Sequence, residues 1–287
     1  MIKTLKNDFL TIKVNSFGAE LTELIDKHQI SRLHDGNPKY WGRRSPILFP
    51  IISRFVDQKY TYQGKEYTIG THGFAREKEF VEYESTPYSI TYLLKDDETT
   101  YLSYPFHFEF YVTYTLHNNT LKVTYTIKNV GENKMYFMVG GHPGFKVPLF
   151  ENEQYEDYYL EFEKAETVEK TKLNGCYLSA ETEPFLNKQK IIPLRYKMFN
   201  PDAYVMEGLK SNFIELKSKT NTKVVRFYFQ EFKKLAIWST LNVDSPFVCF
   251  EPWNGISKRY VDPIEEKGIL ELEAKDTFKC SYVIEIE

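Results

Sequence analysis

The segment FEFYVTYTLHNNTLKVTYTIKNV, residues 108–130, decides the fold class because two alternating runs meet at a polar turn. In the second run one face carries only apolar side chains: Leu121, Val123, Tyr125 and Ile127. Successive side chains of a β-strand point to opposite faces, so this run predicts a half-buried strand. The polar residues 117–120 supply the turn between the runs. The segment therefore predicts an antiparallel hairpin with one apolar face.

The same alternation recurs along most of the chain. YTYQGKEYTI, residues 60–69, predicts a hairpin closed at Gln63-Gly64-Lys65, and VVRFYFQEF, KLAIWST, FVCFE and TFKCSYVIEIE predict further strands. No segment keeps a helical period beyond about two turns. Residues 151–200 are richer in charge, and we expect long loops with short strands there. With no linker and no internal repeat, we predict an all-β protein: one large antiparallel β-sandwich forming a single domain, residues 1–287.

Composition excludes several classes of protein. The aromatic content of 16% favours strands, and the net charge of −3 excludes a globally basic surface for nucleic acid. No apolar run is long enough for a transmembrane helix, and the N-terminal residues lack the apolar core of a signal peptide. Cys176, Cys249 and Cys280 are too sparse to predict disulfides or a zinc site. We expect a cytoplasmic protein that binds neither nucleic acid nor a membrane.

Four short stretches interrupt the strands with polar groups suited to chemistry. They are SPILFPIISRF (45–55) with Arg54, THGFAR (71–76) with His72 and Arg76, GGHPGF (140–145) with His142, and FEPWNG (250–255) with Glu251 and Trp253. A histidine near a strand end usually packs or makes one structural hydrogen bond. His72 and His142 differ because neighbouring glycines let the backbone and a ligand approach closely. For these two, a structural and a functional role both stay open.

Glu251 follows an apolar strand, where an unpaired carboxylate is costly. It is therefore either paired, with Lys258 or Arg259 as nearby candidates, or functional. Trp253 offers a flat apolar face on which a sugar ring can stack, or it is a core residue.

The arginines and one aspartate also allow two interpretations. Arg54 and Arg76 are either solvated charges, with Glu77 and Glu79 as partners, or forks that bind vicinal hydroxyls, a carboxylate or a phosphate. Asp202, in FNPDAYVM, is typical of a Pro-Asp turn.

Nine motifs follow one another along nearly the whole chain: GAELTEL, W-x-R-x-x-P-I-L-F-P-I-I, the Gly-Lys hairpin, HGFAR, N-x-L-x-V-x-Y-x-I-x-N, GGHPGF, PDAYVMEGLKS, LAIWS and FEPWNG. Together they resemble the aldose 1-epimerase (galactose mutarotase) family, and most closely its LacX-type branch. The resemblance implies a large antiparallel β-supersandwich that converts the anomers of an aldose without a metal or an organic cofactor.

The resemblance also implies roles for the acid and the base. Glu251 matches the general base, which takes the proton of the C1 hydroxyl. His142 matches the general acid, which protonates the ring oxygen before the ring opens. These roles require a carboxylate and an imidazolium at neutral pH, so we expect nearby charge to keep His142 protonated when the sugar arrives.

The implied partner is a small-molecule sugar, bound by a monomer or a homodimer. His72 matches a histidine near the ring oxygen, and Arg54 and Asp202 match groups that hold sugar hydroxyls. HGFAR departs from the HGG-type motif of galactose mutarotases and is shared with the branch that acts on hexose 6-phosphates. Arg76 or Arg54 would then meet a phosphate, although FEPWNG differs from that branch. The substrate is thus a hexose or a hexose phosphate.

Two alternative functions remain. A non-catalytic sugar-binding or sugar-sensing protein would keep Arg54, His72 and Trp253 but make no use of the acid–base pair. A glycoside hydrolase needs two carboxylates that flank one bond. The nearest pair in sequence, Asp244 and Glu251, would lie roughly 23 Å apart along one strand, which does not favour this alternative.

Overall fold

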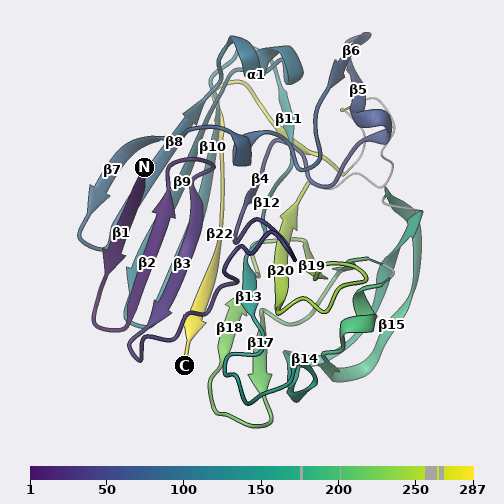
Figure 1. Ribbon diagram of the computed structural model, residues 1–287. Helices are drawn as coiled ribbons and strands as arrows, with labels where there is room; N and C mark the ends of the chain where they lie inside the picture. Colours follow the sequence, from purple (N-terminus) through teal and green to yellow (C-terminus); the bar gives the residue numbers. More distant parts are fainter. Residues whose placement is uncertain (175–176, 201, 256–263, 265–267) are drawn as a thin grey trace.

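The computed structural model describes residues 1–174, 177–200, 202–255, 264 and 268–287 (Figure 1). The predicted all-β class is confirmed, because strands dominate this part of the chain. Its helical elements are α1 (Glu98–Ser103) and four 3-10 turns: Val56–Gln58, Ala75–Glu77, Tyr155–Asp157 and Tyr196–Phe199. None of the described helices has the length and apolar character needed to cross a membrane.

A 15-stranded antiparallel sheet forms the body of the molecule. Its strands in spatial order are β4 (Ile47–Leu48), β12 (Val139–Gly141), β20 (Phe247–Asn254), β19 (Lys234–Trp238), β16 (Tyr204–Glu207), β14 (Tyr158–Asn174), β17 (Phe213–Ser218), β18 (Val225–Tyr228), β22 (Thr277–Ile286), β10 (Thr120–Asn129), β9 (Phe108–His117), β8 (Ser89–Lys95) and β7 (Val81–Thr86). Two further strands branch from this path: β13 (Gly144–Lys146), which pairs with β20, and β15 (Tyr177–Pro193), which pairs with β14.

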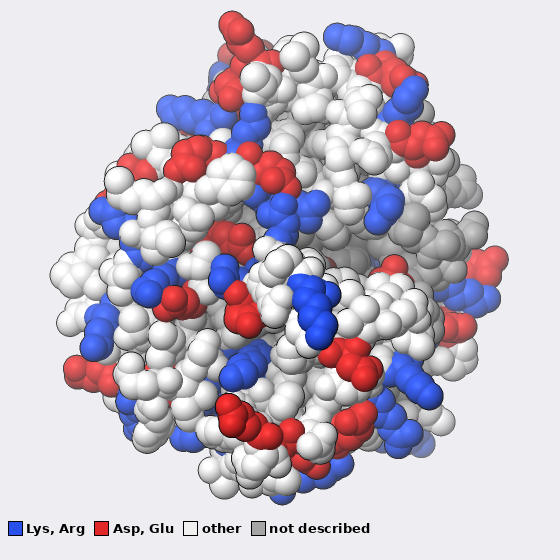
Figure 2. All heavy atoms as spheres, viewed as in Figure 1, with Lys and Arg blue, Asp and Glu red and all other residues white. Residues whose placement is uncertain are grey.

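Smaller sheets complete the sandwich. They comprise β1 (Ile2–Lys6), β2 (Leu10–Asn15) and β3 (Glu20–Asp26); β5 (Lys59–Tyr62) and β6 (Lys65–Thr68); and β11 (Met135–Phe137) and β21 (Leu270–Leu272). In Figure 1 the sheet β1–β3 lies in front of β8–β10. The hydroxyl of Tyr114 on β9 crosses between these layers and donates to the carbonyl of Ala19 (2.7 Å). Lys and Arg are interspersed with Asp and Glu on the face shown in Figure 2, as expected for a chain without a basic surface.

Both predicted hairpins are present. β9 and β10 pair from His117–Thr120 to Phe108–Asn129, and the apolar face of β10 is fully buried. Gln63 and Gly64, with φ of 49° and 75°, close the β5–β6 hairpin, as a type I′ turn requires.

The expectation of loops in residues 151–200 is wrong. β14 and β15 form a hairpin with two 17-residue strands, drawn at the right of Figure 1. Most of β15 is exposed, and the pairing is interrupted by register shifts. β14 begins with the buried alternation Tyr158, Leu160 and Phe162, but its second half and most of β15 carry no regular apolar alternation, so a search for period two does not find the full length of the strands.

Candidate active site

The sheet places His142 directly opposite Glu251. β12 pairs with β20 through Gly140 and Trp253, and β13 continues in the same register on the other side of His142. Residues opposite each other in an antiparallel pair project from the same face. The imidazole Nε2 accordingly lies 3.2 Å from the Glu251 Oε1 atom, and both side chains are buried.

Glycines around His142 are required for space. A Cβ at Gly140 would lie 2.7 Å from the Pro252 carbonyl oxygen, and one at Gly141 would lie 2.8 Å from the Tyr282 ring. Neither glycine has a positive φ. The sequence suggested that the glycines let the backbone and a ligand approach closely, and the structure shows that these two let β12 pack closely against its neighbours.

His72 is held by two hydrogen bonds to Ser53. The Ser53 backbone N–H donates to His72 Nδ1 (3.0 Å), and the His72 backbone N–H donates to the Ser53 carbonyl (2.7 Å). A nitrogen that accepts this bond carries no proton, so the neutral ring carries its hydrogen on Nε2. Gly73, with φ of 72°, lies so close to Phe49 that a Cβ would be 2.3 Å from its carbonyl oxygen. The loop therefore presents His72 as a fixed donor, 5.8 Å from the His142 ring.

These histidines line a cavity of about 240 Å³. All seven residues singled out in the sequence contribute to its wall: Arg54, His72, Arg76, His142, Asp202, Glu251 and Trp253. Sequence reasoning missed eight others: Trp41, Ser53, Thr71, Leu178, Ala203, Val205, Trp238 and Leu241. Trp41 and Trp238 stood within two of the quoted motifs, but no local feature marked them as site residues. The paired carboxylate candidate Asp244 does not line this cavity.

Burial sets the protonation of the acid–base pair. It lowers the pKa of His142 to about 3, and the positive charges of Arg76 and Arg43 act in the same direction. Burial also raises the pKa of Glu251 well above its ordinary value, and the charge of Asp202 adds to this. In the free cavity both shifts favour the uncharged forms, a neutral His142 and a protonated Glu251. The nearby charges of Arg76 and Arg43 are positive and do not keep His142 protonated in the free cavity, and its protonation when the sugar arrives stays a prediction.

The two arginines of the cavity differ in their partners. Arg54 makes no hydrogen bond or ion pair within the part of the chain that the structure describes. Arg76 donates from Nη2 to the Thr71 carbonyl (2.7 Å), and its Nε is buried without a hydrogen-bond partner, 3.8 Å from Glu77. Glu77 also pairs with Arg43, so a single carboxylate serves two guanidinium groups. Burial and Arg43 lower the pKa of Arg76 to about 10.

Asp202 and Trp253 both line the cavity, and each also contributes to the local structure around it. The Asp202 backbone N–H donates to the Phe199 carbonyl (2.8 Å), and its Oδ1 accepts from the Ala203 N–H (2.8 Å). Pro201 of the predicted Pro-Asp turn lies outside the described residues. Burial raises the pKa of Asp202, while the charge of Arg54 opposes this. Trp253 belongs to the hydrophobic core, yet it also borders the cavity.

Several other residues considered in the sequence lie outside the described residues or outside the cavity. Lys258 and Arg259, the alternative partners of Glu251, and Cys176 lie outside the described residues. Cys249 and Cys280 are free and buried. No group of three or more His, Cys, Asp or Glu side chains suited to a metal occurs among the described positions.

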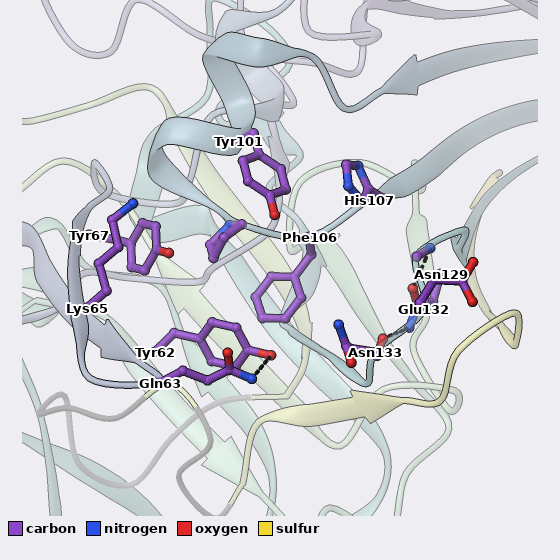
Figure 3. Close-up of a pocket in the computed structure, with 12 residues that line it drawn as sticks. Tyr62, Gln63, Lys65, Tyr67, Tyr101, Phe106, His107, Asn129, Glu132 and Asn133 are labelled. Atoms are coloured by element: carbon purple, nitrogen blue, oxygen red, sulfur yellow. Dashed lines mark hydrogen bonds between the residues drawn. The ribbon is translucent and has the colours of Figure 1, made fainter.

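A larger cavity of about 450 Å³ lies between α1, the β5–β6 hairpin and residues 129–133. Figure 3 shows Tyr62, Tyr101, Phe106 and Asn133 around it. Its one histidine, His107, is half-exposed and bound to Asp96 (2.7 Å) outside the cavity wall. It holds no buried carboxylate–imidazole contact, so the smaller cavity is the candidate active site.

Comparison with known proteins agrees with this geometry. The sequence model of the family described as aldose 1-epimerase matches residues 1–268. The chain belongs to the aldose 1-epimerase family. Two relatives of the chain are the plasmid and chromosomal forms of protein LacX from Lactococcus lactis subsp. lactis. Each is 35% identical over 298 residues, which cover 98% of this chain and 98% of the relative.

Solved structures show the same fold. A galactose mutarotase related enzyme from Lactobacillus acidophilus, 33% identical, has a TM-score of 0.96 and covers 100% of this chain and 97% of its own. A galactose mutarotase-like protein from Lactobacillus casei ATCC 334, 24% identical, has a TM-score of 0.94 with full coverage of both chains. The predicted supersandwich and the LacX-type resemblance are thereby confirmed. Membership of the aldose 1-epimerase family supports a mutarotase-type role, that of an isomerase in carbohydrate metabolism.

Proposed function

We propose that this protein is an aldose 1-epimerase that interconverts the α and β anomers of a hexose or a hexose phosphate. The observation that carries the proposal is the buried contact between His142 Nε2 and Glu251 Oε1, 3.2 Å apart in a cavity lined by hydrogen-bonding groups. Anomer interconversion needs one group that takes a proton and one that gives a proton, and each must recover its state by symmetry.

The chemistry proceeds through an open-chain sugar. Glu251, as a carboxylate, takes the proton from the C1 hydroxyl, and His142, as an imidazolium, gives a proton to the ring oxygen. The C1–O5 bond breaks and leaves an aldehyde at C1. Rotation about the C1–C2 bond presents the other face of the aldehyde, and closure on that face reverses both proton transfers.

The free cavity holds the protons that this chemistry needs. The pKa shifts favour a protonated Glu251 beside a neutral His142, a pair that has one proton to transfer and no net charge. Moving that proton across the 3.2 Å contact produces the carboxylate and the imidazolium without exchange with solvent. The charged form needs stabilisation, which the hydroxyls of a bound sugar can supply by donating to Glu251.

The remaining wall residues would bind and orient the sugar. His72 offers its Nε2–H as a donor to an oxygen near C1 or the ring. Arg54, which has no hydrogen-bond or ion-pair partner among the described residues, can donate to vicinal hydroxyls, and Asp202 can accept from a hydroxyl. Arg54 and Arg76 together would also suit a phosphate, since a guanidinium fork binds this group in a bidentate manner.

Polarimetry of freshly dissolved α-anomers tests the proposal. A panel of hexoses and hexose 6-phosphates is followed in parallel, so that the same experiment identifies the substrate. We expect the wild-type protein to speed the decay of rotation for at least one sugar, and His142→Ala and Glu251→Gln to lose this effect. Rates equal to those of buffer for every sugar would reject the proposal. Calorimetric binding of a sugar by such an inactive wild type, retained in Glu251→Gln, would instead indicate a sugar-binding protein.

A further inference from the structure

The face of the Trp41 indole lies against the His142 ring. Their ring centroids are 4.7 Å apart with an angle of 31° between the planes. Trp238 meets the same imidazole nearly at right angles, at 5.4 Å. His142 is thus enclosed by two indoles, and Glu251 faces its Nε2.

Several contacts fix Trp41 in this position. His34 Nε2 donates to its carbonyl oxygen (3.0 Å), and its own backbone N–H donates to the Asn37 carbonyl (2.9 Å). Phe247 stacks on the indole at 5.5 Å. A Cβ at Gly144 would lie 3.2 Å from the Trp41 ring, so the last glycine of GGHPGF leaves room for it. The stack is therefore part of the folded framework.

The other surroundings of His142 oppose a positive charge, with one exception. Arg76 and Arg43 repel it, His72 is a neutral neighbour at 5.8 Å, and among the described residues Glu251 is the one acidic group in contact with the ring. His142 Nδ1 is buried and makes no hydrogen bond to another residue in the described part of the chain. Asp202 lies near enough to Glu251 to affect that carboxyl. An imidazolium formed here has few groups to stabilise it.

An aromatic face attracts a cation within about 6 Å of its centroid, most strongly when the ring is an indole and water is excluded. We propose that Trp41 is a positioning residue that stabilises the protonated form of His142 through its indole face. The inference rests on the proposed function, because the imidazolium matters only if His142 acts as the acid. Trp41 would then hold the imidazole toward Glu251 and favour the charged form of the pair.

The test replaces the π-face while keeping an apolar side chain. In Trp41→Leu we expect kcat to fall about three- to tenfold, and in Trp41→Phe to fall less, because the phenyl ring retains a weaker π-face. Leu241→Ala, which alters the same cavity wall, should change KM more than kcat. The order Trp, Phe, Leu in kcat is the first part of the expected result.

The second readout does not depend on turnover. The ring-nitrogen NMR signals of His142, assigned with His142→Ala, report its protonation directly. They are followed from pH 8 to pH 4 in the free protein, and in parallel samples with glucose and with glucose 6-phosphate. Because His142 is neutral in the free wild-type protein at neutral pH, the variants are compared in the sugar-containing samples and at the acidic end of the titration. Under these conditions the Trp41→Leu signals should lie nearer those of neutral imidazole than the wild-type signals do, and Leu241→Ala should leave them unchanged.

Unchanged nitrogen signals in a folded Trp41→Leu protein would overturn the inference and leave Trp41 as a wall residue. Shifted signals with an unchanged kcat would overturn it as well, because the charged form would not limit the reaction. If wild type turns over no sugar, the proposed function fails, while the nitrogen signals still test the effect of Trp41 on His142.

Discussion

His142 and His72 lie side by side in the same cavity but have different partners. Ser53 fixes the hydrogen of His72 on Nε2 and limits this ring to donating. His142 faces a carboxyl group, with which it can exchange a proton. Burial and the nearby arginines lower the pKa of both rings, so neither is charged in the free cavity. The Ser53 backbone contact therefore makes His72 a hydrogen-bond donor, and the Glu251 side-chain contact allows His142 to carry a proton.

The buried Glu251 should make the free energy of unfolding depend on pH. Burial raises the pKa of Glu251 above its ordinary 4.5. Above pH 4.5 this carboxyl therefore loses its proton more readily in the unfolded chain than in the folded protein. Its contribution to the free energy of unfolding consequently falls as the pH rises. Glu251→Gln removes this penalty. We expect its stability advantage over wild type to grow with pH above 4.5, by at most about 1.4 kcal/mol per pH unit.

Urea unfolding of both proteins at several pH values checks this prediction, and other titrating groups cancel in the difference. Glu84→Gln on the exposed strand β7 serves as the control and should show no such trend. A Glu251→Gln protein whose stability differs from wild type by the same amount at every pH would contradict the account.

Strand β20 organises the site at the scale of elements. It is buried along its whole length and pairs with β12, β13 and β19, so one strand aligns Glu251 with His142 and brings Trp238 close by. Its apolar run was visible in the sequence, and the carboxylate that follows this run marked the site. The partner strands were less visible, because β12 and β13 contain only three residues each.

Close packing of β12 predicts the effect of a methyl group there. A Cβ at Gly141 would lie 2.8 Å from the buried Tyr282 ring and 3.1 Å from the Tyr125 hydroxyl. We expect Gly141→Ala to destabilise the protein by about 1–3 kcal/mol, the usual cost of overpacking, and to lower activity. Thermal unfolding with a parallel rate assay measures both effects.

Gly70 provides the matched control. It is exposed, and a Cβ there would meet no atom within 4 Å. Gly70→Ala should therefore unfold within a degree or two of wild type. Equal melting temperatures for the two alanine variants would show that an added methyl group at Gly141 does not lower the stability of the protein.

The hairpins show what a sequence predicts well at this scale. β9–β10 and β5–β6 were predicted because each joins alternating strands through a turn with residues suited to positive φ. β14–β15 was missed because most of β15 is exposed and carries no apolar face. The same hairpin contributes Leu178 to the cavity, which no local pattern could indicate.

At the scale of the whole molecule, the site is assembled from segments far apart in sequence. Trp41, His72, His142, Asp202 and Glu251 meet only because the large sheet brings their strands and loops together. The sequence indicated the chemistry through residue types and motif order, and family resemblance supplied the roles. It could not indicate that Trp41 covers His142, or that burial neutralises the pair, since both depend on distances across the fold.

All three tryptophans of the chain line the cavity: Trp41, Trp238 and Trp253. Intrinsic fluorescence therefore reports on the candidate site itself. We expect it to change during urea unfolding over the same concentration range in which enzymatic activity is lost. Activity that disappears well before the fluorescence changes would show that the site is not a rigid part of the fold.

Exchange NMR of a sugar at anomeric equilibrium tests the roles of His142 and Glu251 most directly. Magnetisation transfer between the α and β anomeric protons measures interconversion without a purified anomer or net reaction. With the substrate identified by polarimetry, we predict strong exchange cross-peaks with wild type and none above buffer with either His142→Ala or Glu251→Gln. Exchange that persists in a folded Glu251→Gln protein would contradict the assignment of this pair as the catalytic acid and base.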